Sequence, residues 1–471
     1  MERIKTDLCI IGGGSGGLSL AAGAVQMGAR VVLVEGHKMG GDCLNYGCVP
    51  SKALLAAGQA AQAMRTGGAF GVTPVEPEVD YAAAQAHVAQ AIATIAPHDS
   101  VERFEALGVR VIQAWGRFVS PTELEAGDHV IAARRFVVAT GSSPFVPPIP
   151  GLDGVPYLTN ETLFGLGERP GHLLIIGGGP IGLEMAQAHV RLGCKVTVIE
   201  AERALGRDDP EMAAPVLAKL REEGVEIVEE EAVTRVSGQA GAITVETSGG
   251  SHTGTHLLVA VGRRPSLDRL NLGAAGVDVT RAGVKVDAGL HSSNRRVYAI
   301  GDAAGGGQFT HLAGYHAGVV IRSILLGLPA KAREGHIPRV TYTDPELAQV
   351  GLTEAEARAR HGEKLTVARF DFAGNDRAVA GGGAEGLIKV MVVKGRPVGA
   401  SIAGPEAGEL IGLWALALAN GLKMGAVANM VAPYPTLGEV NKRAAGNYFS
   451  PKLFGNPWVK RVVRLVQRVI P

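Results

Sequence analysis

Two cysteines near the start of the chain have a spacing that suits redox chemistry. Cys43 and Cys48 are separated by four residues that include Gly47, which lets the chain turn so that the two sulfurs can meet. The alanine-rich stretch 53–65 is expected to be helical. The positive end of a helix dipole, with Lys52 close by, lowers the pKa of a nearby thiol and favours the reactive thiolate, especially at Cys48. The pair is therefore predicted to be a redox-active dithiol.

The alternative for this pair is a zinc half-site, although neither a second cysteine pair nor a nearby histidine completes it. The other two cysteines, Cys9 and Cys194, lie in or beside strand-like stretches, where a buried thiol is expected. Four cysteines are too few for the disulfide framework of a secreted protein. The apolar N-terminus is interrupted by glycines from Gly12 onward, and no apolar stretch of about 20 residues occurs, so a cytoplasmic location is expected.

Two glycine-rich turns recur in the chain. Each follows a β-rich run, opens a small-residue helix and is completed by a glutamate at the end of the next strand, Glu35 or Glu200. In such a turn the first glycine permits a tight bend, the second lets backbone amides approach a pyrophosphate, and the third allows helix and strand to pack closely. The three positions are occupied by Gly12, Gly14 and Gly17 in the first turn and by Gly177, Gly179 and Gly182 in the second.

The repeated motif predicts two dinucleotide sites, and two ordinary glycine turns in an α/β domain are the alternative. Two sites in one chain indicate one bound flavin and one exchanging nicotinamide. Glu200 favours NADH over NADPH, because a carboxylate accepts a hydrogen bond from the ribose 2′-hydroxyl and repels a 2′-phosphate. Arg203 and Arg207, which are close by in the sequence, act against that preference.

The composition is typical of a folded protein without a large net positive charge. Charged residues make up 19 % and apolar residues 46 % of 471 residues, which leaves room for about three domains. The formal net charge is +1, so nucleic acid is not expected as a partner.

Further motifs extend the pattern along the chain. They are Ala139-Thr140-Gly141, Val261-Gly262-Arg263-Arg264-Pro265, Tyr298-Ala299-Ile300-Gly301-Asp302, and Thr343-Asp344-Pro345-Glu346 followed by the segment 350–354. Together with the glycine turns and the cysteine pair, they make nearly the whole sequence resemble the pyridine nucleotide–disulfide oxidoreductase family of flavoproteins. That family includes dihydrolipoamide dehydrogenase, glutathione reductase and mercuric reductase.

The resemblance implies an α/β fold with two Rossmann-like dinucleotide-binding domains and a C-terminal α+β dimerisation domain. The expected boundaries are 1–150 with 272–334 for the FAD domain, 151–271 for the NADH domain, and 335–450 for the dimerisation domain of a homodimer. Thr140, Gly141, Gly262 and Asp302 would belong to the cofactor sites, with Asp302 at the ribityl or pyrophosphate part of FAD.

The resemblance also implies roles at the dithiol. Cys48 would be the thiol against the flavin, and Cys43 the outer thiol that exchanges with substrate. Lys52 would lie near the flavin and pair with Glu184, because a buried lysine needs a carboxylate partner. A surface salt bridge is the alternative for these two residues.

The sequence departs from the family pattern near its end. Dihydrolipoamide dehydrogenases and glutathione reductases carry a His-Pro motif followed by a glutamate, and the histidine serves the partner subunit's thiols as acid and base. Here the segment reads Tyr434-Pro435, with Glu439 retained. The reference pKa of tyrosine is about 10 against about 6.5 for histidine, which makes tyrosine roughly a thousandfold scarcer as a base near pH 7.

Mercuric reductases resemble this chain in having a tyrosine at that place, but they carry a C-terminal cysteine pair, whereas no cysteine follows Cys194 here. The expected function is that of a dihydrolipoamide dehydrogenase-like FAD- and NADH-dependent disulfide oxidoreductase. The alternatives are a mercuric reductase-like reductase of metal ions, a quinone reductase, and a redox sensor. Tyr434 as an ordinary packed aromatic also stays open.

The C-terminal segment 451–471 is predicted to contain a basic amphipathic helix. From Trp458 to Ile470 the apolar side chains share one helical face, and four basic residues share the other. The basic residues are Lys460, Arg461, Arg464 and Arg468. Such a helix either lies on an anionic membrane surface or packs on the dimer or the flavin domain.

Overall fold

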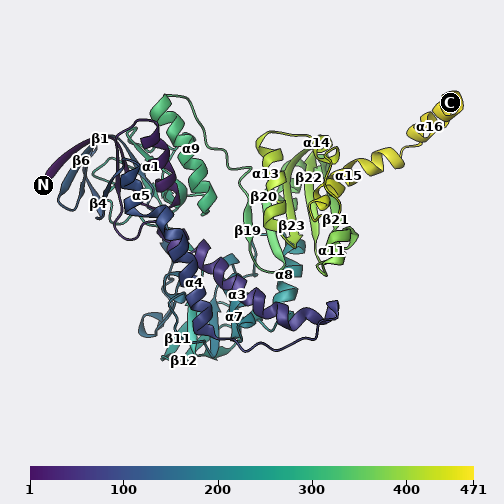
Figure 1. Cartoon of the computed structure of the whole chain (residues 1–471), viewed down its shortest axis with the longest axis horizontal. Coiled ribbons are helices and arrows are strands. Elements are labelled where there is room, and N and C mark those ends of the chain that lie inside the picture. The colour runs from purple at the N-terminus through teal and green to yellow at the C-terminus, as the bar shows by residue number, and fades with distance from the viewer. Residues whose placement is uncertain (471) are drawn as a thin grey trace.

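The computed structural model describes residues 1–470, and Figure 1 shows three sheet-containing bodies with a helical extension at the C-terminus. The first body is built on β1 (Glu2–Ile11), whose last four residues are all buried. It pairs in parallel with β2 (Val31–Val34) on one side and β6 (His129–Val138) on the other. A run that is buried on both faces is typical of the centre of a parallel sheet.

This seven-stranded sheet has the order β3-β2-β1-β6-β5-β4, with β18 added beside β6. The outer strands are β3 (Arg110–Ile112), β4 (Gly116–Ser120), β5 (Glu123–Ala126) and β18 (Val297–Ala299). Because β18 comes from a much later part of the chain, the first body is made of two separated segments. Helices α1 (Ser15–Gln26) and α9 (Thr310–Leu326) pack against each other beside this sheet.

The second body is a four-stranded parallel sheet with the order β10-β9-β8-β14. Its strands are β8 (His172–Ile176), β9 (Lys195–Ile199), β10 (Glu226–Val228) and β14 (His256–Val259), and its main helices are α7 (Pro180–Arg191) and α8 (Pro210–Glu222). An antiparallel three-stranded sheet adds β11 (Val233–Gln239), β12 (Ala242–Thr247) and β13 (Ser251–Gly254). Two short strands, β7 (Ser142–Pro144) and β15 (Arg263–Pro265), pair with each other.

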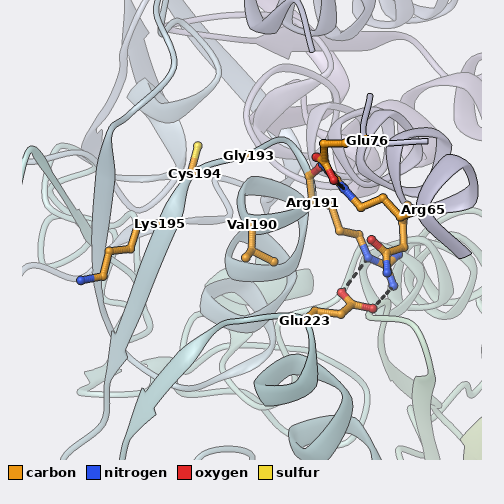
Figure 2. A pocket seen from close by; sticks show the side chains of 9 residues that line it. Arg65, Glu76, Val190, Arg191, Gly193, Cys194, Lys195 and Glu223 are labelled. Atoms are coloured by element: carbon orange, nitrogen blue, oxygen red, sulfur yellow. Dashed lines mark hydrogen bonds and ion pairs between the residues drawn. The ribbon is translucent and has the colours of Figure 1, made fainter. Parts of the chain in front are cut away.

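The first two bodies are joined along helix α3 (Cys48–Thr66), which packs on α7 and on α4 (Tyr81–Ile95). The helices approach closely at Gly58, where a side-chain Cβ would lie 3.2 Å from the carbonyl oxygen of Ala188. At the end of this contact, Figure 2 shows a small pocket at which Arg191 pairs with Glu223 at 2.6 Å. Arg65 on α3 donates to the backbone carbonyl of Arg191 on α7, so a hydrogen bond connects the two helices beside the buried Arg191–Glu223 pair.

The third body is a five-stranded antiparallel sheet with the order β19-β20-β23-β22-β21. Its strands are β19 (Arg339–Thr341), β20 (Glu346–Gly351), β21 (Leu365–Asp371), β22 (Leu387–Val393) and β23 (Arg396–Gly404). The helices around it are α10 (Glu354–His361), α11 (Asp376–Ala380), α12 (Ala407–Leu410), α13 (Gly412–Ala419), α14 (Met424–Ala428) and α15 (Glu439–Phe454). The fully buried Trp414 centres this core and donates to Asn441 of α15 at 2.7 Å.

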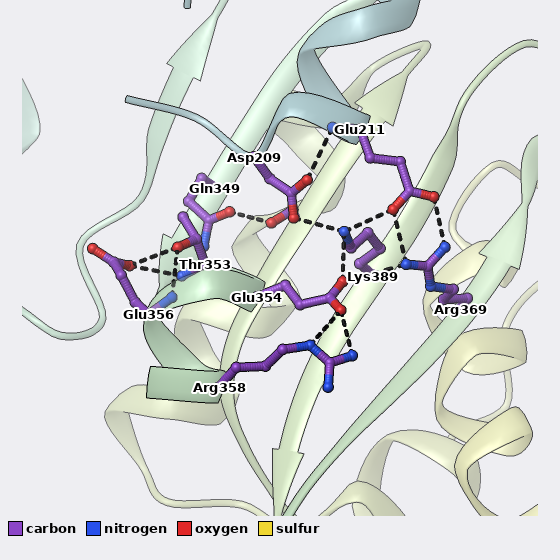
Figure 3. Close-up of polar contacts among 10 residues, drawn as sticks. Asp209, Glu211, Gln349, Thr353, Glu354, Glu356, Arg358, Arg369 and Lys389 are labelled. Atoms are coloured by element: carbon purple, nitrogen blue, oxygen red, sulfur yellow. Dashed lines mark hydrogen bonds and ion pairs between the residues drawn. The ribbon is translucent and has the colours of Figure 1, made fainter. Parts of the chain in front are cut away.

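A buried lysine connects the second body to the third (Figure 3). Lys389 on β22 is 2 % exposed and contacts Asp209, Glu211 and Glu354 at 2.6, 2.9 and 2.7 Å. Asp209 also caps the N-terminus of α8, because its side chain accepts from the backbone N–H of Glu211. Burial alone lowers the pKa of a lysine, but these carboxylates outweigh burial and raise the pKa of Lys389.

The C-terminal extension is formed by the end of one helix and by a second, separate helix. Helix α15 continues through Pro451 to Phe454, and a separate helix α16 (Pro457–Val469) begins after Gly455 and Asn456. Asn456 caps this second helix by accepting from the backbone N–H of Trp458. In Figure 1, α16 projects from the third body, and none of its residues is buried.

The predicted α/β fold class, with two Rossmann-like sheets and a C-terminal α+β body, is confirmed. Within residues 1–470, no helix has the length and apolar character needed to cross a membrane.

Candidate active site

The two cysteines lie on different helices rather than both ahead of one. Cys43 is in the short helix α2 (Gly41–Asn45), and Cys48 is the first residue of α3, directly after its N-cap Gly47. The sequence predicts a helix that starts after both thiols. The tertiary structure extends α3 back to Cys48, so its thiol lies at the positive end of a 19-residue helix.

Both thiols are free, and their electrostatics differ. A hydrogen bond from the Cys43 thiol lowers the pKa of Cys48 to about 6, and the Thr310 hydroxyl and the Lys52 ammonium act in the same direction. The Thr310 oxygen lies 3.4 Å from the Cys48 sulfur. The same interaction, which needs the Cys43 proton as donor, raises the pKa of Cys43. The arrangement therefore holds one thiolate and one thiol near neutral pH.

Lys52 lies one helical turn after Cys48 and pairs with Glu184 of α7 at 2.8 Å. The Glu184 side chain is 6 % exposed and that of Lys52 is 37 % exposed, so the pair is buried on its carboxylate side only. Its other oxygen accepts from the backbone N–H of Tyr342 at 3.0 Å, and the Lys52 ammonium lies 4.2 Å from the centre of the Tyr342 ring. All three bodies thus contribute to the position of one ammonium group beside the dithiol.

A cavity of about 1700 Å³ connects the dithiol with both glycine turns. The two turns have the same geometry: Gly12 and Gly177 both have a φ of +114°, which only glycine adopts readily. A Cβ on Gly17 would lie 1.9 Å from the oxygen of Gly12, and one on Gly182 would lie 2.0 Å from the oxygen of Gly177. No other atom lies within 4 Å of the position that a Cβ on Gly179 would take, which leaves the space that a closely packed pyrophosphate requires.

The two glutamates that complete the turns are also placed alike. The Glu35 carboxylate accepts from the backbone N–H groups of Gly13 and His37, both at 2.6 Å. The Glu200 carboxylate accepts from Gly178 at 2.7 Å and from Glu202 at 3.0 Å. Both carboxylates line the cavity. Each is therefore fixed across its glycine turn, where a ribose of a bound dinucleotide can reach it.

The other residues expected at the cofactor sites also line this cavity. Asp302 accepts from the Ser142 hydroxyl at 2.5 Å, and its burial raises its pKa. The Thr140 hydroxyl oxygen is buried without a hydrogen-bond partner, and Gly141 and Gly262 have positive φ angles of +63° and +127°. An unsatisfied buried hydroxyl beside a glycine turn fits a bound polar group. The residues present therefore fit the FAD that the resemblance implies.

Tyr434 and Glu439 are not part of this cavity in their own chain. Tyr434 is 69 % exposed, and its hydroxyl donates to Asp376 at 2.8 Å. That hydrogen bond raises the pKa of Tyr434, so the phenol is neutral near pH 7. Glu439 begins α15 a few residues later. The sequence pattern did not indicate Asp376 as the partner of this tyrosine.

Sequence reasoning also missed Arg263 as a site residue. Its guanidinium contacts Asp42 at 2.9 Å, the Ser142 hydroxyl at 2.8 Å and Asn160 at 3.3 Å. It therefore links the segment just before Cys43 to the Asp302 side of the cavity. The Gly262-Arg263-Arg264-Pro265 motif indicates that an arginine lies near the site, but nothing in the motif shows which of its two arginines this is. Thr310 and Tyr342 had no such signal, because their contacts with Cys48 and Lys52 come from distant parts of the chain.

The comparisons with known proteins define the class. Residues 6–317 match the description pyridine nucleotide-disulphide oxidoreductase, and residues 337–445 match the dimerisation domain of the same family. The chain therefore belongs to the pyridine nucleotide-disulphide oxidoreductase family, whose members are flavin-dependent enzymes.

Particular relatives cover most of the chain. A dihydrolipoyl dehydrogenase of Bacillus subtilis is 35 % identical over 92 % of this chain and 96 % of its own length. A mercuric reductase of Bacillus cereus is also 35 % identical, over 93 % of this chain and 70 % of its own length. Among solved structures, a Cu(II) complex of the HOCl-induced flavoprotein disulfide reductase RclA from Escherichia coli is 29 % identical, with a TM-score of 0.83, and covers 92 % of this chain and 98 % of that one.

The expectations about family, enzyme class and α/β fold are confirmed by these matches. The family uses FAD with NADH or NADPH, and the dimerisation domain indicates a homodimer. The choice of nicotinamide and the electron acceptor belong to the proposal that follows.

Proposed function

We propose that this enzyme carries two electrons from NADH, by way of FAD, to the Cys43–Cys48 disulfide and from there to a small-molecule disulfide. The single observation that carries the proposal is the asymmetric dithiol, in which Cys48 is a thiolate at the start of α3 in the cavity that contains both glycine turns. When bound, FAD accepts a hydride from the nicotinamide and makes the electron pair available to the disulfide.

The cysteine steps balance as a thiol–disulfide exchange. Two electrons and one proton open the Cys43–Cys48 disulfide, which leaves the Cys48 thiolate and the Cys43 thiol. Cys43 loses its proton to water and attacks a sulfur of the substrate disulfide, so that a mixed disulfide forms and one substrate thiolate leaves and takes up a proton. The Cys48 thiolate then attacks the Cys43 sulfur. This step restores the internal disulfide and releases the second substrate thiolate.

The residues around the dithiol support this division of roles. The Lys52 ammonium, held by Glu184, stabilises negative charge at Cys48 and remains in place through the cycle because its partner is buried. Cys43 keeps its proton more tightly, so the rate of its attack is limited by the small fraction of Cys43 thiolate present near neutral pH. We propose that Tyr434 of one subunit and the dithiol of the partner form the acceptor site, with the neutral phenol as a hydrogen-bond donor rather than a base.

NADH is the proposed electron donor. The Glu200 carboxylate lines the cavity beside the second glycine turn, and a carboxylate at the end of the next strand would repel a 2′-phosphate, which supports NADH. Arg203 lies 3.7 Å from the Glu230 carboxylate in an exposed pair, and Arg207 also lines the cavity, so both arginines act against this preference.

A second candidate function is the reduction of a thiophilic metal ion. Mercuric reductases are among the relatives, and a related reductase has been solved as a Cu(II) complex. The observation that favours it is Tyr434, a neutral phenol where a disulfide-exchanging enzyme needs a base. In that reaction, oxidation of the dithiol to the disulfide would supply one electron to each of two Cu(II) ions. A quinone that takes electrons directly from the flavin is the third acceptor class.

Acceptor screening of the NADH-reduced enzyme separates these classes. Lipoamide and other small disulfides, Cu(II), Hg(II) and a water-soluble quinone are each added under anaerobic conditions, and reoxidation is followed by flavin absorbance. The proposal expects fast reoxidation by at least one disulfide, and loss of that reaction in both Cys43→Ser and Cys48→Ser. Reoxidation by quinone that survives both substitutions, without any disulfide turnover, would remove the dithiol from the final step.

A further inference from the structure

The C-terminal helix α16 is the most strongly amphipathic element of the described chain, and no function above uses it. Its apolar side chains fall on one face of the helix, among them Trp458, Val462, Leu465 and Val466. They are exposed rather than packed; Trp458 is 69 % and Leu465 is 62 % exposed. A contiguous exposed apolar face of this kind marks an interaction surface.

The charge around this face is of one sign. Residues 440–471 contain seven of the chain's 46 Lys and Arg residues and none of its 45 Asp and Glu residues. The preceding part of the chain is therefore net acidic, although the whole chain carries only +1. Four of the basic residues lie on α16 itself, on the face opposite the apolar side chains. They are Lys460, Arg461, Arg464 and Arg468.

The position of α16 separates it from the family's own subunit contact. The match to the dimerisation domain ends at residue 445, before α16 begins at Pro457. In Figure 1 the helix extends from the third body and points away from the two nucleotide-binding bodies. Gly455 and Asn456 separate it from α15, so it can reorient without disturbing the sheet below.

We propose that α16 docks the enzyme on an anionic phospholipid surface, lying flat with its apolar face among the acyl chains and its basic face among the headgroups. A lipid leaflet offers an apolar layer and a layer of negative charge at the same time, which is the pattern that α16 presents. Thirteen helical residues span about 20 Å, which is shorter than a membrane core of about 30 Å, so the helix lies in the interface and does not cross it.

The dimer strengthens this binding. A homodimer carries two copies of α16, and once one copy is bound the second is held near the same surface, which raises the overall affinity without a new contact. The net acidic remainder of the chain is repelled by the same lipids, so contact is confined to the two helices. The enzyme would thus work at the membrane surface, whichever acceptor it uses.

Vesicle co-sedimentation of the FAD-containing dimer tests the proposal. We expect binding to phosphatidylcholine vesicles that contain phosphatidylglycerol, weak binding to pure phosphatidylcholine, and loss of binding at high salt. Arg464→Gln with Arg468→Gln should weaken binding about 30-fold, given the attraction of each basic residue to an anionic surface.

A matched pair of single substitutions tests the role of the apolar face. Val466→Glu and Gln467→Glu change the charge equally, but only the first puts a carboxylate into that face. We expect Val466→Glu to abolish binding, and Gln467→Glu to weaken it about fivefold. Gel filtration and flavin reduction by NADH in solution, measured on every variant, should not change.

Three results would overturn the proposal. They are no binding to anionic vesicles at low salt, an equal effect of the two glutamate substitutions, and a change in subunit assembly caused by Val466→Glu. The last result would mean that α16 packs on a protein partner. None of these results bears on the acceptor, so the failure of this proposal is distinct from a failure of the proposed reaction.

Discussion

Removal of the Thr310 hydroxyl should raise the pKa of the Cys48 thiol by about one unit. The hydroxyl oxygen lies 3.4 Å from the Cys48 sulfur and favours its charged form. Hydrogen bonds to charged groups contribute about 1.5–3 kcal/mol, and the length of this one places it at the lower end. At 1.36 kcal/mol per pKa unit, about 1.5 kcal/mol moves the pKa from about 6 to about 7.

The sign of the pH effect follows from which form carries charge. The Cys48 thiolate dominates above the pKa and is lost as the pH falls through it. At pH 6 the thiolate fraction should therefore fall from about one half to about one tenth in Thr310→Val, whereas at pH 8 the two proteins should differ little. Thr310→Ser keeps the hydroxyl and should behave as the parent does.

The assay is a pH titration of the long-wavelength absorbance that a thiolate gives beside flavin. It is carried out in a Cys43→Ser background, where Cys48 cannot form the internal disulfide and the serine hydroxyl can take the place of the Cys43 thiol as hydrogen-bond donor. The readout is therefore the difference in midpoint between the Thr310 variants and this background. Cys9 and Cys194 do not interfere, because burial raises the pKa of both thiols. An unchanged midpoint in Thr310→Val would refute the reasoning, and it would leave the hydrogen bond from residue 43, the helix terminus and Lys52 as the sources of the low pKa. An equal shift in Thr310→Ser would mean that repacking, not the hydroxyl, is responsible.

Three further predictions concern other parts of the molecule. Lys389→Met should lower the free energy of unfolding by about 3–5 kcal/mol in urea at pH 7, because buried carboxylates lose their cation. Burial acts to raise the pKa of Glu354, but hydrogen bonds from Lys389 and Arg358 lower it to about 2. The pairing of Glu354 with these cations therefore stabilises the fold above pH 4.5, and this stabilisation is lost as the pH falls towards 2. Between pH 4.5 and 2, the free energy of unfolding of Lys389→Met should therefore fall less than that of the parent. Glu200→Ala should narrow the preference for NADH over NADPH in stopped-flow flavin reduction, and equal rates in the parent would contradict the proposed donor. Tyr434→His should raise the rate of dihydrolipoamide oxidation by a factor of about 10²–10⁴ without changing the rate of flavin reduction by NADH. If the variant gains nothing and the parent already turns over lipoamide at an ordinary enzyme rate, the tyrosine does not exclude this substrate.

The local motifs could be predicted because each depends on a few neighbouring residues. The two glycine turns need glycine at fixed positions for backbone reasons, and the structure gives Gly12 and Gly177 the same φ of +114°. The amphipathic tail was visible for a similar reason, since the faces of a helix follow directly from residue order. The start of this helix is local too: α16 begins at Pro457 because Gly455 ends one helix and Asn456 caps the next.

The sequence by itself determined the α/β fold class, the two turns suited to dinucleotides and the cysteine pair, since spacing and residue type suffice for each. Only the tertiary structure decided how the dithiol is tuned. Thr310 reaches Cys48, and Tyr342 reaches both Lys52 and Glu184, because separate bodies pack together at the start of α3. It also decided that Tyr434 donates to Asp376 and that Lys389 is buried among three carboxylates. Such contacts join residues far apart in the chain, and their energies depend on burial, which local sequence does not specify.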